Sequence, residues 1–476
     1  MVKFFKYLCI SLIIFNVLSL ESPAQIDKSS YYNRGEKFYY NYFYEPINKG
    51  DSIKVITMYK IAYDLLKFEK DEETTIEERY ISYPEIEINF LDEEGVIKKS
   101  NRQNDTIIVD NYKLINSIND YSYGSFVTKL SYQEYTPILY LRDKELVKLS
   151  EKKLQTLNLK DFNAKLNLSS PLVCYSPQTT DSLGKYIYPY ILDRNASFSS
   201  NDILFYFLVK NRQNDRLYHA AIEYLDAKKS TVPWEGPARL PIYSKTFYDK
   251  KIQFINNNNE KPVFQIIDAS LEESAYKGIL ELRMTADMTA PGKYKLLLWS
   301  NQDKDTLEYP FKIIWENIPF TLRNPQYAAD IMYYVLNDDE YDEIKSGSDR
   351  EILNNIFKWW KKQDPTRFTI YNEAMTEYFR RADYAFFNFK TIYEKDGAKT
   401  DRAKIYILKG PPDKIENSME KTGKIHDIWF YKRLKKKYIF ESDKNGIIYL
   451  KEIKDIKNNQ SPSNDVGSQS KPSQGI

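Results

Sequence analysis

The first two thirds of the chain, residues 26 to 318, follow a strand-and-turn pattern of apolar and polar positions. Ile86 to Phe90 alternates between the two kinds of residue, Asp92 to Gly95 supplies turn formers, and Val96 starts a returning run. This order predicts a β-hairpin. Ile203 to Val209 is a continuous apolar run and predicts a further strand.

Asn- and Asp-rich pentapeptides recur between the predicted strands. Asn-Arg-Gln-Asn-Asp occupies both 101–105 and 211–215, and a related sequence occupies 301–305. We expect each of them to form a turn, because Asn and Asp side chains hydrogen-bond the nearby backbone. Shared turn chemistry explains the repetition better than a duplication does.

The late Pro291-Gly292 turn, followed by an aromatic and leucine-rich strand, is typical of the last hairpin in an immunoglobulin-like sandwich. We therefore predict a multidomain, mostly β chain. One β-sandwich is expected at 25–160 and a second at 190–318. The segment 161–189, rich in Asn, Ser, Pro and Tyr, is predicted to connect them.

Beyond Pro319 the period becomes helical. Residues 319–347 predict a helical linker with a cap at Asn337, and Ser348 with Glu351 forms a capping box. Two amphipathic helices are expected next. The first buries Ile352, Leu353, Ile356, Phe357 and Trp360, and the second buries Met375, Tyr378, Phe379, Ala382, Ala385, Phe386 and Phe389, with Glu377, Arg381 and Asp383 pointing away.

A small antiparallel sheet is expected to complete an α+β domain at 348–454. Its four strands are predicted at Ala403–Lys409, Asp427–Tyr431, Lys437–Glu441 and Ile447–Glu452. Residues 455–476 are rich in Ser, Asn, Gln and Pro, so we expect a disordered tail.

Residues 1–24 have the pattern of a secretory signal peptide. Lys3 and Lys6 precede an apolar run from Leu8 to Leu20, and Ser22-Pro23-Ala24 offers small residues for cleavage before Gln25. The run is shorter than the roughly 20 residues of a spanning helix, so the mature chain is expected to have no transmembrane segment. We predict a periplasmic, outer-membrane-associated or secreted protein. The alternative is an uncleaved anchor.

The residue types that most enzymes need are scarce. After cleavage Cys174 would be the sole cysteine, and it is expected to be a buried hydrophobe. The two histidines, His219 and His426, fall in different predicted domains, and the chain has no glycine-rich phosphate loop. We assign no catalytic, cofactor-binding or metal-binding residue.

Charge is nearly balanced over the whole chain, at 69 Lys plus Arg against 67 Asp plus Glu. Residues 351–476 carry 25 Lys plus Arg and 17 Asp plus Glu, which makes this end basic by 8 charges. Lys432, Arg433, Lys435, Lys436 and Lys437 concentrate the excess at one predicted hairpin turn. The run is either a solvated turn or a contact for an anionic envelope partner, and nucleic acid is not expected.

One set of motifs is specific enough to indicate a family. In order, it comprises Trp359-Trp360, Asp364-Pro365-Thr366, Asn372-Glu373, Arg380-Arg381, Tyr384-Ala385, Gly397-Ala398-Lys399-Thr400-Asp401-Arg402, Tyr406-Ile407-Leu408 and Gly410-Pro411-Pro412-Asp413. Residues 348 to 454 resemble the GWxTD-domain family of bacterial cell-envelope proteins, with Ala398 in the place of the tryptophan. The resemblance implies a C-terminal domain behind β-rich modules and brings no established activity.

The polar residues of these motifs have a structural and a functional interpretation. Thr400 or Asp401 could bind free backbone amides where a loop enters a strand, while Arg402 pairs with a carboxylate such as Glu373. Gly410-Pro411-Pro412-Asp413 could be a rigid turn. Alternatively, Glu373, Asp401, Asp413 and Glu416 could serve catalysis. A strand of seven residues, roughly 20 Å long, would keep Asp401 apart from Asp413.

Two functions remain open from the sequence. The favoured one is an exported interaction or scaffold protein whose partner is an envelope protein or an anionic surface component. The alternative is a hydrolase that uses carboxylates to cleave envelope glycan or peptide.

Overall fold

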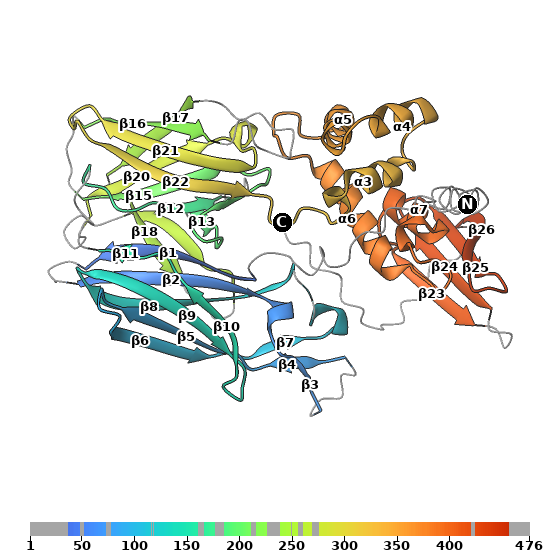
Figure 1. The fold of residues 1–476 in the computed structure, drawn as a ribbon, viewed down its shortest axis with the longest axis horizontal. Helices are drawn as coiled ribbons and strands as arrows, with labels where there is room; N and C mark the ends of the chain where they lie inside the picture. The colour runs from blue at the N-terminus through green and yellow to red at the C-terminus, as the bar shows by residue number, and fades with distance from the viewer. Residues whose placement is uncertain are drawn as a thin grey trace, which may run out of the picture. The chain divides into compact units, whose positions relative to one another are not determined.

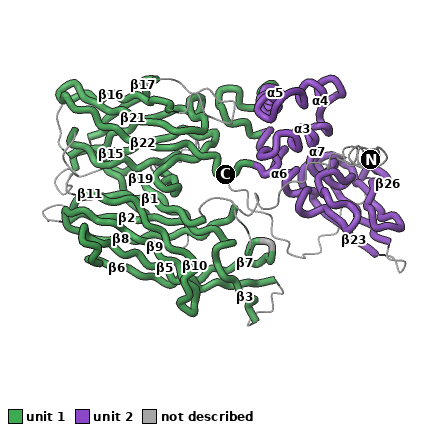
Figure 2. The backbone as a smooth tube through the Cα atoms, viewed as in Figure 1, with its two compact units in different colours: residues 1–318, 361–373 green, residues 319–360, 374–476 purple. Residues whose placement is uncertain are grey.

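The computed structural model describes residues 37–456 except 48–51, 73–77, 116, 118, 160–165, 177–184, 211–215, 226–238, 249, 256–259, 269–275 and 420–423. The expected signal peptide, the turn at 211–215 and residues 457–476 therefore lie outside the described part. The chain divides into two compact units (Figure 2). Unit 1 comprises residues 1–318 and 361–373, and unit 2 comprises residues 319–360 and 374–476.

Unit 1 is built from β-sheets, which confirms the mostly β prediction (Figure 1). Three strands pair in the order β1-β2-β8, namely Phe38–Pro46, Ser52–Ala62 and Tyr121–Ser131. A second sheet has the order β10-β9-β5-β6, namely Lys148–Lys153, Glu134–Arg142, Glu85–Leu91 and Ile97–Asn104, with β11 (Leu157–Asn158) paired to β9. A small sheet contains β3 (Glu69–Lys70), β4 (Tyr80–Ser82) and β7 (Ile107–Val109).

The largest sheet of unit 1 has eleven strands. Their order is β14-β22-β21-β16-β17-β20-β15-β12-β13-β19-β18. Their bounds are Ala196–Ser197, Thr306–Ile314, Gly292–Ser300, Tyr218–Tyr224, Arg239–Phe247, Gly278–Met284, Ile203–Val209, Leu172–Tyr175, Lys185–Pro189, Val263–Asp268 and Lys250–Ile255. β12 and β13 lie in the segment expected to be an irregular connector. Cys174 of β12 is fully buried, as expected.

β15 is buried on both faces, which explains why its sequence is apolar without interruption. Leu204, Tyr206 and Leu208 join the core that contains β1, β2 and β5. Ile203, Phe205, Phe207 and Val209 join a second core with β16, β21 and β22. A strand with no solvated face has no reason to alternate.

β17 links the two halves of the large sheet. Its residues Arg239–Ile242 pair with β16, whereas Tyr243–Phe247 pair with β20. Across the second core, the ring of Phe205 in β15 lies 5.1 Å from that of Phe311 in β22. The two halves of the sheet therefore face each other over a shared core.

The turns predicted at the Asn- and Asp-rich pentapeptides have different outcomes. Residues 301–305 do form the turn between β21 and β22. The prediction of a turn at 101–105 is wrong, because residues 101–104 belong to β6 and the chain reverses earlier, at Asp92–Gly95. β6 is an edge strand with mostly exposed side chains, so polar residues carry no burial cost there.

The helices lie where their caps and periods predict them. Their bounds are Pro325–Met332 (α3), Asp338–Lys345 (α4), Asp349–Lys362 (α5) and Glu373–Asn388 (α6). Asn337 caps α4 and completes a capping box with Glu340, and Glu351 accepts from the Ser348 amide at 2.8 Å. Trp360 and Phe379 pack together with ring centroids 6.3 Å apart.

Asp383 of α6 differs from the prediction. Asp383 was expected to point away from the core, but its carboxylate accepts hydrogen bonds from the amides of Phe320 and Thr321. These amides begin the 3₁₀ turn η4 (Thr321–Arg323), whose first donors have no partner within the turn. Asp383 thereby fixes the start of unit 2 to α6.

The predicted strand at Ala403–Lys409 is wrong, because these residues form α7 (Asp401–Lys409). The run Ile405-Tyr406-Ile407 has the composition of a strand, but Thr400 caps the segment at one end and Gly410 ends it at the other. Four antiparallel strands follow in the order β23-β24-β25-β26, namely Lys414–Met419, Ile425–Tyr431, Lys436–Ser442 and Ile448–Asp455.

The connection between α5 and α6 belongs to unit 1. The ring of Tyr371 lies 5.1 Å from that of Phe198 and 6.4 Å from that of Trp315. The amide of Ile370 donates to the carbonyl of Ala286 at 3.4 Å. Residues 361–373 thus extend the second core of the β-rich unit.

Candidate functional site

The start of α7 gathers the most specific motif residues. Thr400 is buried, and its hydroxyl oxygen accepts from the Ala403 amide at 3.1 Å while donating to the Gly397 carbonyl at 3.0 Å. The first amides of a helix lack partners within it, so this hydroxyl is an N-cap. Gly397 lies against the end of α6, where a Cβ atom would come within 2.3 Å of the Ala385 carbonyl oxygen.

Asp401 and Arg402 join α7 to the neighbouring elements of unit 2. The Asp401 carboxylate accepts from the Leu450 amide of β26 at 2.7 Å. The Arg402 guanidinium lies 3.2 Å from the Asp427 carboxylate of β24 and donates to the Phe389 carbonyl. The expected pairing of Arg402 with Glu373 is therefore wrong.

The Gly-Pro-Pro-Asp segment carries the chain from α7 into β23. Gly410 has φ of 82° and donates its amide to the Tyr406 carbonyl at 2.8 Å, which ends the helix. Its own carbonyl accepts from the Tyr431 hydroxyl at 2.8 Å. Asp413 accepts from the Lys432 amide at 2.6 Å. Pro411 is exposed and Pro412 is half-buried.

Three of the polar residues considered from the sequence, Glu373, Arg380 and Glu416, are not drawn into this group. Glu373 is the first residue of α6 and accepts from the Thr366 hydroxyl, within unit 1. Arg380 is exposed on α6. Glu416 is paired with its neighbour Lys414 at 3.0 Å. Of the five cations of the basic run, Lys432, Arg433 and Lys435 lie in the turn between β24 and β25, and Lys436 and Lys437 begin β25.

Two phenols, the buried Tyr327 of α3 and the half-buried Tyr334 after it, support the motif. The Tyr334 hydroxyl donates to the Ala398 carbonyl at 2.9 Å, and that of Tyr327 donates to Asp396 at 2.7 Å. Burial, reinforced by the Asp396 and Asp401 carboxylates, raises the pKa of Tyr334 to about 12. Burial likewise raises the pKa of Tyr327, again with Asp396 adding to it. Both phenols therefore remain hydrogen-bond donors to a higher pH than an ordinary tyrosine does.

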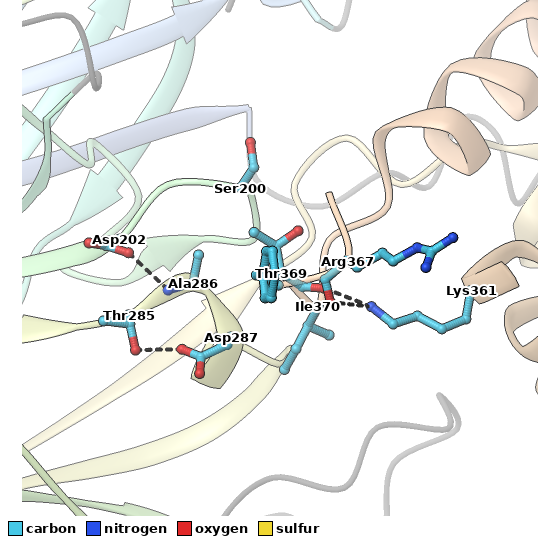
Figure 3. Close-up of a pocket in the computed structure, with 10 residues that line it drawn as sticks. Ser200, Asp202, Thr285, Ala286, Asp287, Lys361, Arg367, Thr369 and Ile370 are labelled. Carbon is cyan, nitrogen blue, oxygen red and sulfur yellow. Dashed lines mark hydrogen bonds between the residues drawn. The ribbon is translucent and has the colours of Figure 1, made fainter. Parts of the chain in front are cut away.

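An open pocket of about 510 Å³ lies in unit 1 (Figure 3). Asp202 and Asp287 stand on one side of it, Lys361 comes from the end of α5, and Arg367 comes from the α5–α6 connection. The rest of the lining is Ser200, Thr285, Ala286, Phe368, Thr369 and Ile370. Phe368 is 90% exposed.

Most of the charged groups in the pocket already have partners. Asp202 accepts from the Ala286 amide at 2.9 Å, and Asp287 accepts from the Thr285 hydroxyl at 2.5 Å. Lys361 binds the buried Asp364 at 2.9 Å and the carbonyls of Arg367 and Thr369, so it shapes the loop. Arg367, which is exposed, and the ring of Phe368 are the groups that the loop offers to a ligand.

Several residues with defined roles were not singled out from the sequence. Asp427 and Asp396 each receive hydrogen bonds that hold motif residues. Arg367 and Phe368 directly follow the quoted Asp364-Pro365-Thr366 turn. The adjacent cation and aromatic ring in this loop were the only features of the sequence that could have indicated the pocket.

The fold and the α7 motif define a strand-rich chain with a compact helix-and-sheet region at its C-terminal end. Residues 297–449 match the family model of the GWxTD domain, so the chain carries this domain. The match begins in β21 of unit 1 and extends to β26 of unit 2. No curated protein matches the chain. None of the helices in the described ranges has the length and hydropathy needed to cross a bilayer.

Proposed function

We propose that this chain is an exported cell-envelope or secreted interaction protein, in which β-rich modules present the GWxTD domain to a partner. The signal-like pattern of residues 1–24 supports export, and the family match supports an envelope role. Its location would be the periplasm, the outer membrane surface or the medium.

One observation favours an interaction role over catalysis: the polar side chains of the motif are engaged in hydrogen bonds and an ion pair within unit 2. Asp401 and Asp413 each bind a backbone amide, and Arg402 binds Asp427. A general acid or nucleophile must instead face its substrate. Among the described residues, no group of three or more His, Cys, Asp or Glu is placed to hold a metal ion. A carboxylate hydrolase is thus the weaker reading.

At finer detail, we propose two immunoglobulin-like sandwiches, at 25–160 and 190–318, and a C-terminal α+β domain at 348–454. For the second sandwich, the support is the change of partner within β17 and the core shared by β15 and β22. For the C-terminal domain, it is the attachment of α7 to β24 and β26 by Arg402 and Asp401.

The unit 1 pocket is the place where we expect a polypeptide partner to dock. An aromatic ring that is 90% exposed gains apolar contact when a partner covers it, and arginine beside it adds a directed donor. Aromatic and arginine side chains dominate the energetics of protein interfaces.

Affinity capture from an envelope fraction tests this function. The wild-type chain is compared with Arg367→Ala/Phe368→Ala, and the matched control is Ile392→Ala/Lys395→Ala, which also removes an exposed apolar residue and a cation. We expect one partner to be enriched by the wild type and the control and lost with the pocket variant. Equal enrichment by all three would reject the pocket as the interface.

Export is tested separately by sequencing the amino terminus of the protein recovered from cells. We expect the mature chain to begin at Gln25. Recovery of Met1 in the membrane fraction would show an anchor instead. Cleavage of envelope glycan or peptide by the purified chain, lost on Asp401→Ala, would favour the hydrolase.

A further inference from the structure

The basic run spans the turn between β24 and β25 and the first two residues of β25, and we call it the basic turn: Lys432, Arg433, Leu434, Lys435, Lys436 and Lys437. Residues 432–435 connect β24 to β25, and 432–436 are exposed. Five of these six side chains are cationic, so the turn is the densest cluster of positive charge in the sequence of unit 2.

Little of this charge is neutralised within the chain. Lys436 lies 3.3 Å from Asp455. Asp413, the nearest acidic residue of the preceding motif, accepts from the backbone amide of Lys432. In the described part of the chain, no ion pair is formed by the side chains of Lys432, Arg433, Lys435 or Lys437. Four cations therefore remain available to an external anion.

The cations are held on a fixed scaffold. Tyr431 and Lys436 are paired across the hairpin, and the Lys435 amide donates to the Lys432 carbonyl at 3.0 Å. The rings of Tyr431 and Tyr438 meet edge-on at 5.3 Å, and Tyr431 also binds the Gly410 carbonyl. Ordering the backbone on binding therefore costs little.

Leu434 gives the turn an apolar residue among its cations. It is 36% exposed, although it lies between Arg433 and Lys435. Cations around an exposed apolar side chain match the interface of an anionic bilayer, where phosphates meet the charges and the acyl boundary takes the leucine. An acidic protein surface would use the charges but not require the leucine.

We propose that the basic turn binds anionic phospholipid headgroups and holds the exported protein at a membrane surface. The proposal rests on the envelope role proposed above, of which it names one partner class. It involves none of the pocket residues, so the two can fail independently.

Vesicle co-sedimentation with the full chain tests the proposal. The probes are vesicles of equal parts phosphatidylglycerol and phosphatidylcholine, and vesicles of phosphatidylcholine alone. We expect binding to the anionic vesicles only, and weaker binding at higher salt because screening shortens the range of the attraction. Equal binding to both vesicle types would overturn the proposal.

Charge variants locate the binding surface. Lys432→Gln/Arg433→Gln/Lys435→Gln should weaken binding on the order of 100-fold, at roughly fivefold per cation near an anionic surface. The matched control, Lys312→Gln/Lys358→Gln/Lys404→Gln, removes the same charge from exposed sites elsewhere and should bind within about twofold of wild type. Equal weakening by both sets would show a global charge effect and reject the turn.

The variant Leu434→Ser distinguishes binding to a membrane from binding to an acidic protein. We expect it to weaken vesicle binding and to leave the salt dependence unchanged. The lipid proposal is wrong if the wild type does not sediment with the anionic vesicles. If, in addition, the wild type captures an acidic envelope protein and only the triple basic-turn variant fails to capture it, the basic turn is a protein contact.

Discussion

Single residues of the GWxTD motif act mainly on the backbone. Thr400 supplies a helix cap from a buried position, whereas Asp401 reaches an amide of β26 from an exposed one. The same type of contact has a different energetic weight in these two settings, because water can replace a lost partner only where it has access.

We expect Thr400→Ala to lower the free energy of unfolding by about 1 to 2 kcal/mol, because the Ala403 amide loses its cap. Asp401→Ala should cost less than about 1 kcal/mol, since water can reach the Leu450 amide. Urea unfolding of both variants, with Thr400→Ser as the control that keeps the hydroxyl, measures the difference. The opposite order would contradict the assigned roles. Loss of partner capture by a stable Asp401→Ala variant would instead assign that carboxylate to the ligand.

At the scale of elements, α5 and α6 are held by aromatic packing. Phe379 is fully buried and its ring lies 5.3 Å from that of Tyr378 and 6.3 Å from that of Trp360. Phe386, about two helical turns further on, is also buried. These helices therefore bury the apolar stripe seen in the sequence, except that Leu353 and Phe357, predicted to be buried, are half-buried.

Truncation of Phe379 to Ala should cost about 3 to 5 kcal/mol, because a large ring leaves a cavity in a packed core. Trp360→Ala and Phe386→Ala should lie near this range. Phe368→Ala is the matched control, and with its ring 90% exposed it should change stability by less than about 0.5 kcal/mol. Thermal melting compares them, and near-wild-type melting of Phe379→Ala would mean that the stripe is not core.

In the sheet of unit 2, two lysine side chains bind the carboxylate of Glu441 in β25. Hydrogen bonds from Lys424 at 2.7 Å and from Lys451 lower the pKa of Glu441 from 4.5 to about 2. A carboxylate whose pKa falls on folding stabilises the native state fully above its unfolded value. This contribution should be complete above about pH 4.5 and should disappear as the pH falls towards 2.

The free energy of unfolding of the wild type should therefore fall between about pH 6 and about pH 2, the range set by this pKa shift. The fall should be smaller in Glu441→Gln, which lacks the titrating carboxylate. Glu416→Gln serves as the control, because that carboxylate lies on an exposed strand and pairs with its neighbour Lys414. Parallel pH profiles for wild type and Glu441→Gln would contradict the assigned role.

At the scale of the whole molecule, the GWxTD match crosses the boundary between the two compact units. It includes β22 and the connection 361–373, which belong to unit 1, together with the helices and strands of unit 2. Tyr371 anchors that connection to the β-rich core through Phe198 and Trp315. Part of the region that matches the GWxTD model is thus a loop packed on the core of unit 1.

We expect Tyr371→Ala to loosen the connection, because the Tyr371 ring, with Ile370, packs the connection against the second core. Hydrogen exchange at the Ile370 amide, which donates to the Ala286 carbonyl, should become faster. Exchange in α7 and β24 should not change, and Phe368→Ala should leave the Ile370 amide as protected as in the wild type. Unchanged protection in Tyr371→Ala would show that other contacts hold the loop.

The sequence by itself determined the strand-rich character of the first 318 residues, the caps and apolar stripes of α4, α5 and α6, and the GWxTD family. These features rest on local period and on caps, which lie within a few residues of the elements that they define. Asn337 and Ser348 are examples, since each begins its helix where expected.

Only the tertiary structure decided how the remaining residues are used. Ile405-Tyr406-Ile407 has strand propensity, but the Thr400 cap and the packing of Ala403, Ile405 and Ile407 make it a helix. The partners of Arg402 and Asp401, in β24 and β26, are 25 and 49 residues away along the chain. Local pattern carries no information about such long-range pairs, so Asp427 and the pocket beside Phe368 became visible only once the chain was folded.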